Sequence, residues 1–286
     1  MMTSLAQDYA ALDVPEVLLR LFHPRPELAL FNPPTSGQEI IIPVDPGVVI
    51  GGRFYAADTK APTLLFFHGN GEIAADYEDL GPLYNRQGLN FLPVDYRGYG
   101  RSTGEPTVSN MMRDCHVIFA FAQEWLNQKG FSGPLAVMGR SLGSASALEL
   151  AAAHQDRLAG LIIESGFAYA GPLLKLLGVN VEALGFIEET GFRNVDKIRH
   201  WRKPLLIIHA EFDHIIPFAE GQALYEASHS LEKTFLKVAG ANHNDILAVG
   251  FAAYLEAVAR LGALLKREKA FSIPNASHEI KKGPLT

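Results

Sequence analysis

Short apolar runs and helical stretches alternate along most of the sequence, and this alternation restricts the fold more than any other feature. The apolar runs lie at residues 63–68, 90–96, 135–139, 158–164, 204–209 and 232–238. Continuous apolar runs of this kind are typical of strands that are buried on both faces of a parallel sheet. Helical patterns lie between them, at about residues 75–88, 107–129, 142–155, 218–229 and 243–268. We therefore predict an α/β fold with a mostly parallel sheet and helices on both faces.

Two further strand-like runs, at residues 39–44 and 48–56, have no helix between them. They predict an antiparallel edge and bring the predicted sheet to eight strands. The alternation breaks at about residues 168–200, where Gly171-Pro172 is a good helix start. This interval predicts a short lid above the sheet.

The two ends of the chain differ from its middle. Residues 6–22 are typical of an extra helix that packs on the outside, and the last residues are polar with two prolines. The predicted parts are an N-terminal helical extension, an α/β domain that includes the lid, and a flexible C-terminal tail, at residues 1–37, 38–268 and 269–286.

Residues 139–143 read GRSLG and lie between a predicted strand and a predicted helix. A strand that runs straight into a helix needs a tight turn, and Gly139 and Gly143 have no side chains to obstruct it. Such a turn would expose the Ser141 hydroxyl at the carboxyl edge of the sheet, where open α/β folds bind ligands. We predict that Ser141 is an activated nucleophile. The alternative is a small residue in a structural turn.

A nucleophilic serine needs a base, and the base needs a third group that orients it. Asp213 and His243 follow the last two predicted strands, so they can meet Ser141 at the carboxyl edge of the sheet. A histidine can take the serine proton at neutral pH, and an aspartate can hold its tautomer and stabilise the imidazolium. We predict these roles for His243 and Asp213. Glu164, which also follows a strand, is the rival acid.

The oxyanion of an acyl-transfer transition state needs N–H donors. We predict the main-chain N–H groups of Leu142, at a helix N-terminus, and of Asn70, which lies between two glycines after a strand. His68 in the same loop is interpreted as a structural residue. Arg140 needs a carboxylate partner if it is partly buried, and Glu164 is the candidate. That pairing would weaken the rival assignment of Glu164.

Apolar side chains of the predicted lid allow two interpretations. Leu173, Leu177 and Phe186 form a candidate acyl-binding pocket. Equally, they could pack the lid onto the body of the protein.

Composition excludes several classes of function. The net charge is −6 with no basic stripe, so nucleic acid is not a predicted partner. None of the ten histidines stands in a metal-ligand spacing, so no metal is predicted. No G-x-x-x-x-G-K-[ST] motif is present, which argues against nucleotide hydrolysis.

Three sequence features together predict the compartment in which the protein is found. No apolar run reaches the ~18 residues of a membrane span, and no signal peptide is evident at the start. The single cysteine, Cys115, excludes an internal disulfide and suits a reducing compartment. Its apolar helical surroundings favour a packing role. We therefore predict a cytoplasmic protein.

Five sequence blocks together resemble the α/β-hydrolase superfamily over about residues 38–268. They are HGNG, VDYRGYGRS, GRSLG, AEFDHIIP and GANHND, at residues 68–71, 94–102, 139–143, 210–217 and 240–245. The chain order Ser141, Asp213, His243 is also that of the superfamily. The sequence is most similar to the small-lid acyl hydrolases, which include esterases and protein depalmitoylases. This resemblance implies hydrolysis of carboxylic esters or thioesters of small molecules through an acyl-enzyme, with no cofactor.

Two other functions stay open on the same fold. Aminopeptidases of this type use acidic cap residues to hold the substrate amine, and Glu182, Glu188 and Glu189 lie in the predicted lid. A non-catalytic ligand binder is the second alternative, although such proteins usually lack a member of the triad. No sequence feature selects the acyl chain, the leaving group or an oligomeric state.

Overall fold

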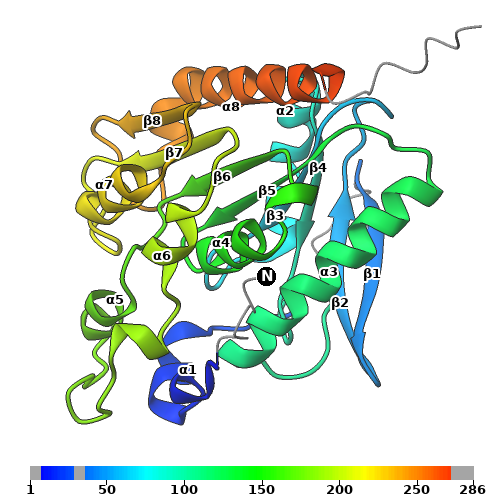
Figure 1. Cartoon of the computed structure of the whole chain (residues 1–286). Coiled ribbons are helices and arrows are strands. Elements are labelled where there is room, and N and C mark those ends of the chain that lie inside the picture. Colours follow the sequence, from blue (N-terminus) through cyan, green and yellow to red (C-terminus); the bar gives the residue numbers. More distant parts are fainter. Residues whose placement is uncertain (1–7, 29–35, 272–286) are drawn as a thin grey trace, which may run out of the picture.

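Eight strands form a sheet in the order β1-β2-β4-β3-β5-β6-β7-β8 (Figure 1). The computed structural model describes residues 8–28 and 36–271. The strands are β1 Gln38–Asp45, β2 Val48–Phe54, β3 Thr63–Phe67, β4 Asn90–Val94, β5 Leu135–Arg140, β6 Gly160–Glu164, β7 Leu205–Ala210 and β8 Lys233–Val238. The first three in the sheet pair antiparallel and all later pairs are parallel. The predicted α/β fold with an eight-stranded, mostly parallel sheet is confirmed.

Burial along the strands explains their sequence patterns. Every residue of β3, β4, β6 and β7 is buried, as expected for strands covered on both faces. The edge strand β1 instead alternates exposed and buried side chains over much of its length, and β8 at the other edge is mostly half-buried or exposed. Apolar runs therefore identify the central strands, whereas the edge strands carry polar residues.

Helices cover both faces of the sheet. They are α1 Pro15–Leu21, α2 Leu80–Arg86, α3 Val108–Gln128, α4 Gly143–Ala153, α5 Ala170–Leu176, α6 Asn194–Arg199, α7 Phe218–Ala227 and α8 Ile246–Phe271. Residues of α2 and α8 share one buried cluster with one side of the sheet, and residues of α3, α4 and α7 share the other. Cys115 of α3 is buried in the second of these clusters. Figure 1 shows α8 above the sheet and α3 and α4 in front of it.

Several boundaries differ from the sequence-based prediction. The helix expected at about residues 75–88 is a 3-10 turn, Ala74–Tyr77, followed by the short α2. The N-terminal helix expected at residues 6–22 is also shorter, because α1 begins at Pro15, a residue suited to the first turn of a helix. Helix α8 continues to Phe271, beyond the predicted start of the tail at residue 269. Residues 1–7 and 272–286 lie outside the described part of the chain.

The predicted lid contains two short helices, α5 and α6, joined by a loop with a 3-10 turn at Glu188–Thr190. In Figure 1, α1 lies beside this region, near the carboxyl ends of the strands. The main-chain N–H of Asn180 donates a hydrogen bond to Glu16 Oε1 of α1 at 3.0 Å. The N-terminal extension therefore contacts the lid directly.

Helix α8 contains a segment, Ile246–Arg267, that is long and apolar enough to cross a membrane by length and composition alone. In the structure its buried residues Tyr254, Val258, Leu261 and Leu265 pack against the sheet. A helix that covers the face of a sheet passes the same test, so this finding is weak support for a span.

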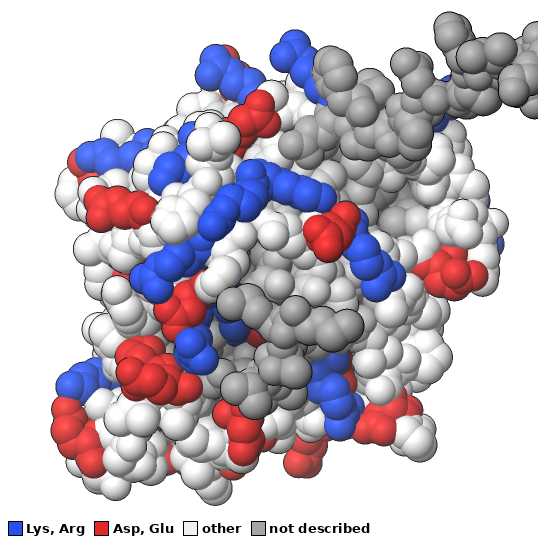
Figure 2. All heavy atoms as spheres, viewed as in Figure 1, with Lys and Arg blue, Asp and Glu red and all other residues white. Residues whose placement is uncertain are grey.

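Charged side chains on one face of the molecule are unevenly distributed. Figure 2 shows an arc of Lys and Arg side chains across the face that carries α3 and α4, with Asp and Glu side chains beside it. The overall charge of −6 is therefore an average over regions of both signs.

Candidate active site

Ser141 occupies a sharp turn between β5 and α4. Its φ angle is 51°, in the left-handed region that is unusual for a residue with a side chain. A Cβ atom on Gly139 would lie 2.2 Å from the Gly143 carbonyl oxygen, and one on Gly143 would lie 2.1 Å from the Phe67 carbonyl oxygen. Both positions therefore require glycine. Strained backbone of this kind clusters at functional sites, because the surrounding structure must hold it in place.

The structure brings Ser141, His243 and Asp213 into one hydrogen-bonded line. His243 Nε2 lies 3.1 Å from Ser141 Oγ. His243 Nδ1 lies 2.8 and 2.9 Å from the two carboxylate oxygens of Asp213. All three residues are buried, yet Ser141 keeps 9% of its surface exposed. A base thus contacts the hydroxyl, and an acid contacts the base, which is the arrangement that activates a serine.

The loop after β7 holds the Asp213 carboxylate in place. Asp213 Oδ1 accepts hydrogen bonds from the main-chain N–H groups of Ile215, at 3.0 Å, and Ile216, at 2.8 Å. Burial opposes ionisation of this carboxyl, but the hydrogen bond and charge of His243 and the Ile216 N–H hold its pKa below the ordinary value. Asp213 is therefore ionised at neutral pH and can stabilise a positive imidazole.

Two main-chain N–H groups are predicted to receive an oxyanion. Leu142 stands at the start of α4, directly after Ser141. Asn70 lies in the loop after β3. Among the described residues, neither N–H has a hydrogen-bond acceptor. The structure thus leaves both predicted donors available, as electrostatic stabilisation of a transition state requires.

The N-terminal segment fixes the side chain of Asn70. Asn70 Oδ1 accepts hydrogen bonds from the His23 main-chain N–H and from the Tyr99 hydroxyl, each at 2.7 Å. Two residues further on, Arg25 Nε donates to the Gly71 carbonyl oxygen at 2.7 Å. Sequence reasoning missed these contacts, because residues 22–28 carry no motif or periodicity that points to the loop after β3.

Comparisons with known proteins agree with this architecture. A family model described as serine aminopeptidase, S33, matches residues 58–179. The Pyrococcus furiosus esterase Pf2001 has a TM-score of 0.67 over 86% of this chain and 99% of its own, at 18% sequence identity. Est1E from Butyrivibrio proteoclasticus, solved with ferulic acid bound, has a TM-score of 0.64 over 77% of this chain and 96% of its own, also at 18% identity. This chain therefore has the α/β-hydrolase fold.

Curated relatives match about two thirds of this sequence. Human alpha/beta hydrolase domain-containing protein 17B is 34% identical over 206 residues, which cover 68% of this chain and 64% of that protein. Protein bem46 of Schizosaccharomyces pombe is 28% identical over 197 residues, which cover 64% of this chain and 62% of that protein. The α/β-hydrolase chain thus spans slightly less than two thirds of the length of these relatives.

The rival acid Glu164 is engaged with other residues, and two further histidines near the site, His209 and His214, do not contact Ser141 in any hydrogen bond of the described residues. Glu164 is buried and accepts hydrogen bonds from Arg140 Nε, at 3.1 Å, and from the Tyr254 hydroxyl, at 2.6 Å. This is the pairing expected from the sequence, and it occupies the rival acid. His209 is buried, with Nε2 2.8 Å from the Ile216 carbonyl oxygen, and His214 is exposed.

His68 has the structural surroundings that its sequence context indicated. Its side chain is fully buried, with Nδ1 2.8 Å from the Gly69 carbonyl oxygen and Nε2 3.3 Å from Asp95 Oδ1. Its ring also packs on Tyr96 and Tyr99. His68 therefore supports the loop after β3 from the buried side.

The three residues proposed for an acyl pocket differ in burial. Leu173 is buried in the hydrophobic core, whereas Leu177 and Phe186 are partly buried and pack against it. Packing of the lid thus explains Leu173, and the pocket role of all three residues stays a prediction. Leu176 and Ile187 of the same region are more than half exposed.

Within residues 8–28 and 36–271, no group of three or more His, Cys, Asp and Glu side chains could hold a metal ion.

Proposed function

We propose that this protein is a serine hydrolase that cleaves carboxylic esters or thioesters through an acyl-enzyme on Ser141. The observation that carries the proposal is the unbroken line of contacts from the Asp213 carboxylate through His243 to Ser141 Oγ. A serine hydroxyl in a solvated turn would have neither a histidine in contact with it nor an aspartate behind that histidine. The strained backbone at Ser141 further supports a reactive role.

The proposed reaction follows from the positions of these atoms. His243 Nε2 takes the proton of Ser141 Oγ as that oxygen attacks the carbonyl carbon of the substrate. The N–H groups of Leu142 and Asn70 donate to the oxyanion of the tetrahedral intermediate. His243 then gives its proton to the departing alcohol or thiol, and Asp213 stabilises the imidazolium throughout. Water, activated by the same histidine, releases the acid and restores Ser141.

The lid region supports an acyl substrate. Side chains of Leu176 and Ile187 are exposed, and Leu177 and Phe186 are partly buried, on the region that follows β6. An apolar surface on the lid of a hydrolase favours the acyl part of an ester over a charged group. Two structural relatives are named as esterases or bind ferulic acid, which fits the same class of substrate.

An aminopeptidase is the second candidate, favoured by the description of the matching family model. An aminopeptidase needs a carboxylate that is free to hold the substrate amine. Glu188 Oε2 and Oε1 instead accept hydrogen bonds from the first main-chain N–H groups of α5, those of Ala170 at 3.0 Å and Gly171 at 2.6 Å. Glu182 pairs with Lys175 on the surface. These engagements favour the esterase proposal.

A rate screen distinguishes the candidates. Initial rates are measured for p-nitrophenyl esters from acetate to palmitate, for acyl-CoA thioesters and for aminoacyl anilides, with Ser141→Ala as the control. We expect ester or thioester turnover that falls by at least about 10⁴-fold in Ser141→Ala, because the variant keeps the oxyanion donors but lacks the nucleophile.

Other outcomes would contradict the proposal in different ways. Turnover of anilides alone would support the peptidase. Ester turnover retained in a folded Ser141→Ala protein would exclude Ser141 as the nucleophile. Failure of a fluorophosphonate to label Ser141 would support the non-catalytic binder, because only an activated serine is phosphonylated.

A further inference from the structure

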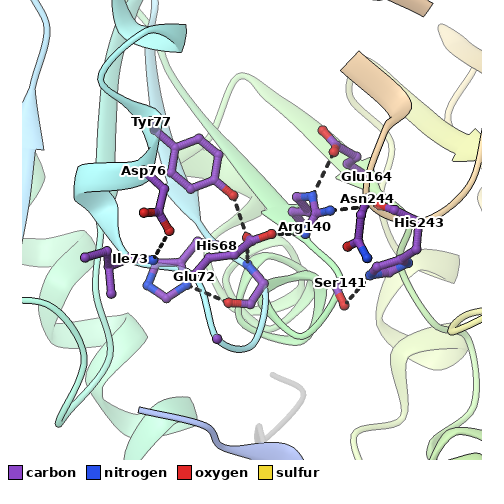
Figure 3. Close-up of polar contacts among 12 residues, drawn as sticks. His68, Glu72, Ile73, Asp76, Tyr77, Arg140, Ser141, Glu164, His243 and Asn244 are labelled. Carbon is purple, nitrogen blue, oxygen red and sulfur yellow. Dashed lines mark hydrogen bonds and ion pairs between the residues drawn. The ribbon is translucent and has the colours of Figure 1, made fainter. Parts of the chain in front are cut away.

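Arg140, the residue before the proposed nucleophile, is nearly buried, with 11% of its side chain exposed. Its guanidinium contacts three separate segments (Figure 3). Nε donates to Glu164 Oε1 at the end of β6, at 3.1 Å. Nη1 donates to Glu72 Oε1 in the loop after β3. Nη2 donates to the His243 carbonyl oxygen in the loop after β8, at 2.8 Å. One planar group therefore joins the end of β6, the loop after β3 and the loop after β8.

Glu72 extends this contact to the oxyanion loop. Its second oxygen, Oε2, accepts hydrogen bonds from the Gly69 main-chain N–H, at 2.7 Å, and from the Tyr77 hydroxyl, at 2.5 Å. Gly69 is the neighbour of Asn70, whose N–H is one proposed oxyanion donor. Burial opposes ionisation of Glu72, but the charge of Arg140 and the hydrogen bonds from Tyr77 and Gly69 together lower the pKa of the carboxyl. Glu72 is thus a charged acceptor that fixes the turn carrying Asn70.

Glu164 anchors the opposite side of Arg140. Its Oε2 accepts the Tyr254 hydroxyl at 2.6 Å, and the Tyr254 and Tyr84 hydroxyls lie 2.9 Å apart. Both tyrosines are buried between the sheet and its covering helices. Glu164 therefore holds the guanidinium from the buried side, and the guanidinium reaches from there to the loop of His243 and to the loop of Asn70.

We propose that Arg140 is a positioning residue. It sets the positions of His243 and of the Asn70 N–H donor relative to Ser141, and Glu72 is its link to the donor. The proposal rests on the proposed serine hydrolase function and adds to it a determinant of rate outside the triad. Arg140 does not contact the reacting atoms. It acts by holding the His243 main chain and, through Glu72, the main chain beside Asn70.

The residue type suits this task. A guanidinium is planar and always charged, and it presents five donors in a fixed fork, so it can satisfy three acceptors in fixed directions at once. A lysine at the same place would keep the charge but would supply a single flexible point of contact. Since a displacement of about 1 Å at a reacting group can lower a rate about 10²-fold, loss of the fork should affect turnover strongly.

The test compares Arg140→Lys with wild type by rate per active site. Active sites are titrated with a fluorophosphonate, and kcat, KM and the phosphonylation rate constant are expressed per titrated site. A merely structural role would reduce the number of active sites but not the rate at each. We expect kcat and the phosphonylation rate constant per site to fall by about 10–100-fold, with KM changed by less than about threefold.

Arg97→Lys is the matched control. Arg97 is also a nearly buried arginine, with 8% exposure, and it pairs with Asp114 and Asp45 away from the proposed triad. Its substitution should lower stability and leave both rates per site within about twofold of wild type. Rates of Arg140→Lys that stay within about twofold of wild type per site, or an equal loss in Arg97→Lys, would overturn the proposal.

Glu72→Gln covers the case in which Arg140→Lys does not fold. Glutamine can still accept the Gly69 N–H but loses the charge that attracts Arg140, so a smaller loss of rate per site is expected. Wild-type rates per site in Glu72→Gln would overturn the link between Arg140 and the oxyanion loop.

Phosphonylation also separates this proposal from the substrate proposal. It requires Ser141, His243 and the oxyanion donors but no particular acyl substrate. If the wild-type protein is labelled at Ser141 and hydrolyses no ester or thioester, the substrate assignment fails, and the phosphonylation rates of the variants still decide the role of Arg140.

Discussion

Glu149 joins four segments of the protein, and its substitution gives a prediction whose size follows from the structure. It lies on α4, the helix that begins beside Ser141. Its Oε2 accepts hydrogen bonds from the Tyr9 hydroxyl, at 2.8 Å, and lies 2.6 Å from Lys197 Nζ of α6. Its Oε1 lies 3.3 Å from His116 Nε2 of α3. The carboxylate thus connects the N-terminal segment, α3 and the lid region to the helix that begins beside Ser141.

Burial opposes ionisation of Glu149, but the hydrogen bond from His116 and the charge of Lys197 hold its pKa at about 2, against an ordinary value of 4.5. Each pKa unit corresponds to about 1.4 kcal/mol, so a fall from 4.5 to about 2 stabilises the fold by at most about 3–4 kcal/mol. Burial also lowers the pKa of Lys197 in spite of its carboxylate partner, which offsets part of this gain. We expect a net contribution of about 2 kcal/mol.

The sign of the pH dependence follows from the lowered pKa. A carboxyl whose pKa falls on folding contributes fully above its unfolded pKa and loses this contribution as the pH falls toward its folded pKa. For Glu149 the loss begins near the ordinary value of 4.5 and continues toward a pH of about 2. The wild-type protein should therefore lose about 1–2 kcal/mol of stability between a pH of about 5 and about 3 through this residue alone.

Urea unfolding of wild type, Glu149→Gln and Tyr9→Phe between about pH 7 and pH 3 measures this contribution. At neutral pH, Glu149→Gln should be less stable by about 3 kcal/mol, because Lys197 stays buried without its counter-charge. Its stability should fall less steeply with acid than that of wild type.

Tyr9→Phe is the control, since it removes one hydrogen bond to the carboxylate but no charge. It should cost about 1 kcal/mol and keep most of the wild-type pH slope. Equal slopes for wild type and Glu149→Gln would refute the assignment of the acid-sensitive stability to Glu149.

Two further substitutions probe the site. Asp213→Asn should lower kcat by about 10³–10⁴-fold with little change in folding, because an amide cannot stabilise the imidazolium of His243. Steady-state kinetics would contradict this expectation if the loss stayed below about tenfold. Gly143→Ala would place a Cβ atom 2.1 Å from the Phe67 carbonyl oxygen and must force α4 away from β3. Thermal unfolding should show a Tm lower by more than about 5 °C, and an unchanged Tm would contradict the proposed close packing.

Most of the fold was predictable because its signals are local. Eight apolar or β-branched runs became eight strands, since period and length distinguish strands from helices without any knowledge of contacts. The turn at Ser141 was predictable for the same reason, because Gly139 and Gly143 stand beside it in the sequence. Boundaries were less accurate where the helix signal was weak, as for α1 and for the 3-10 turn before α2.

The meeting of Asp213 and His243 with Ser141 was also predictable, although these residues lie far apart in the chain. Each follows the carboxyl end of a strand, and in a parallel sheet those ends share one edge. Chain order and strand direction were enough for this inference. The pairing of Arg140 with Glu164 followed in the same way, because these residues end neighbouring strands and lie opposite each other in the register of β5 and β6.

The sequence by itself therefore determined the order of strands and helices, the turn at Ser141 and the edge of the sheet at which the candidate triad assembles. Only the tertiary structure placed Glu72 against Arg140, His23 against Asn70, and Tyr9 against Glu149. None of these partners belongs to a repeating pattern, and each pair lies on segments whose separation depends on how loops and side chains pack. Periodicity encodes which face of an element is buried, whereas contacts between irregular segments arise only when the whole chain is packed together.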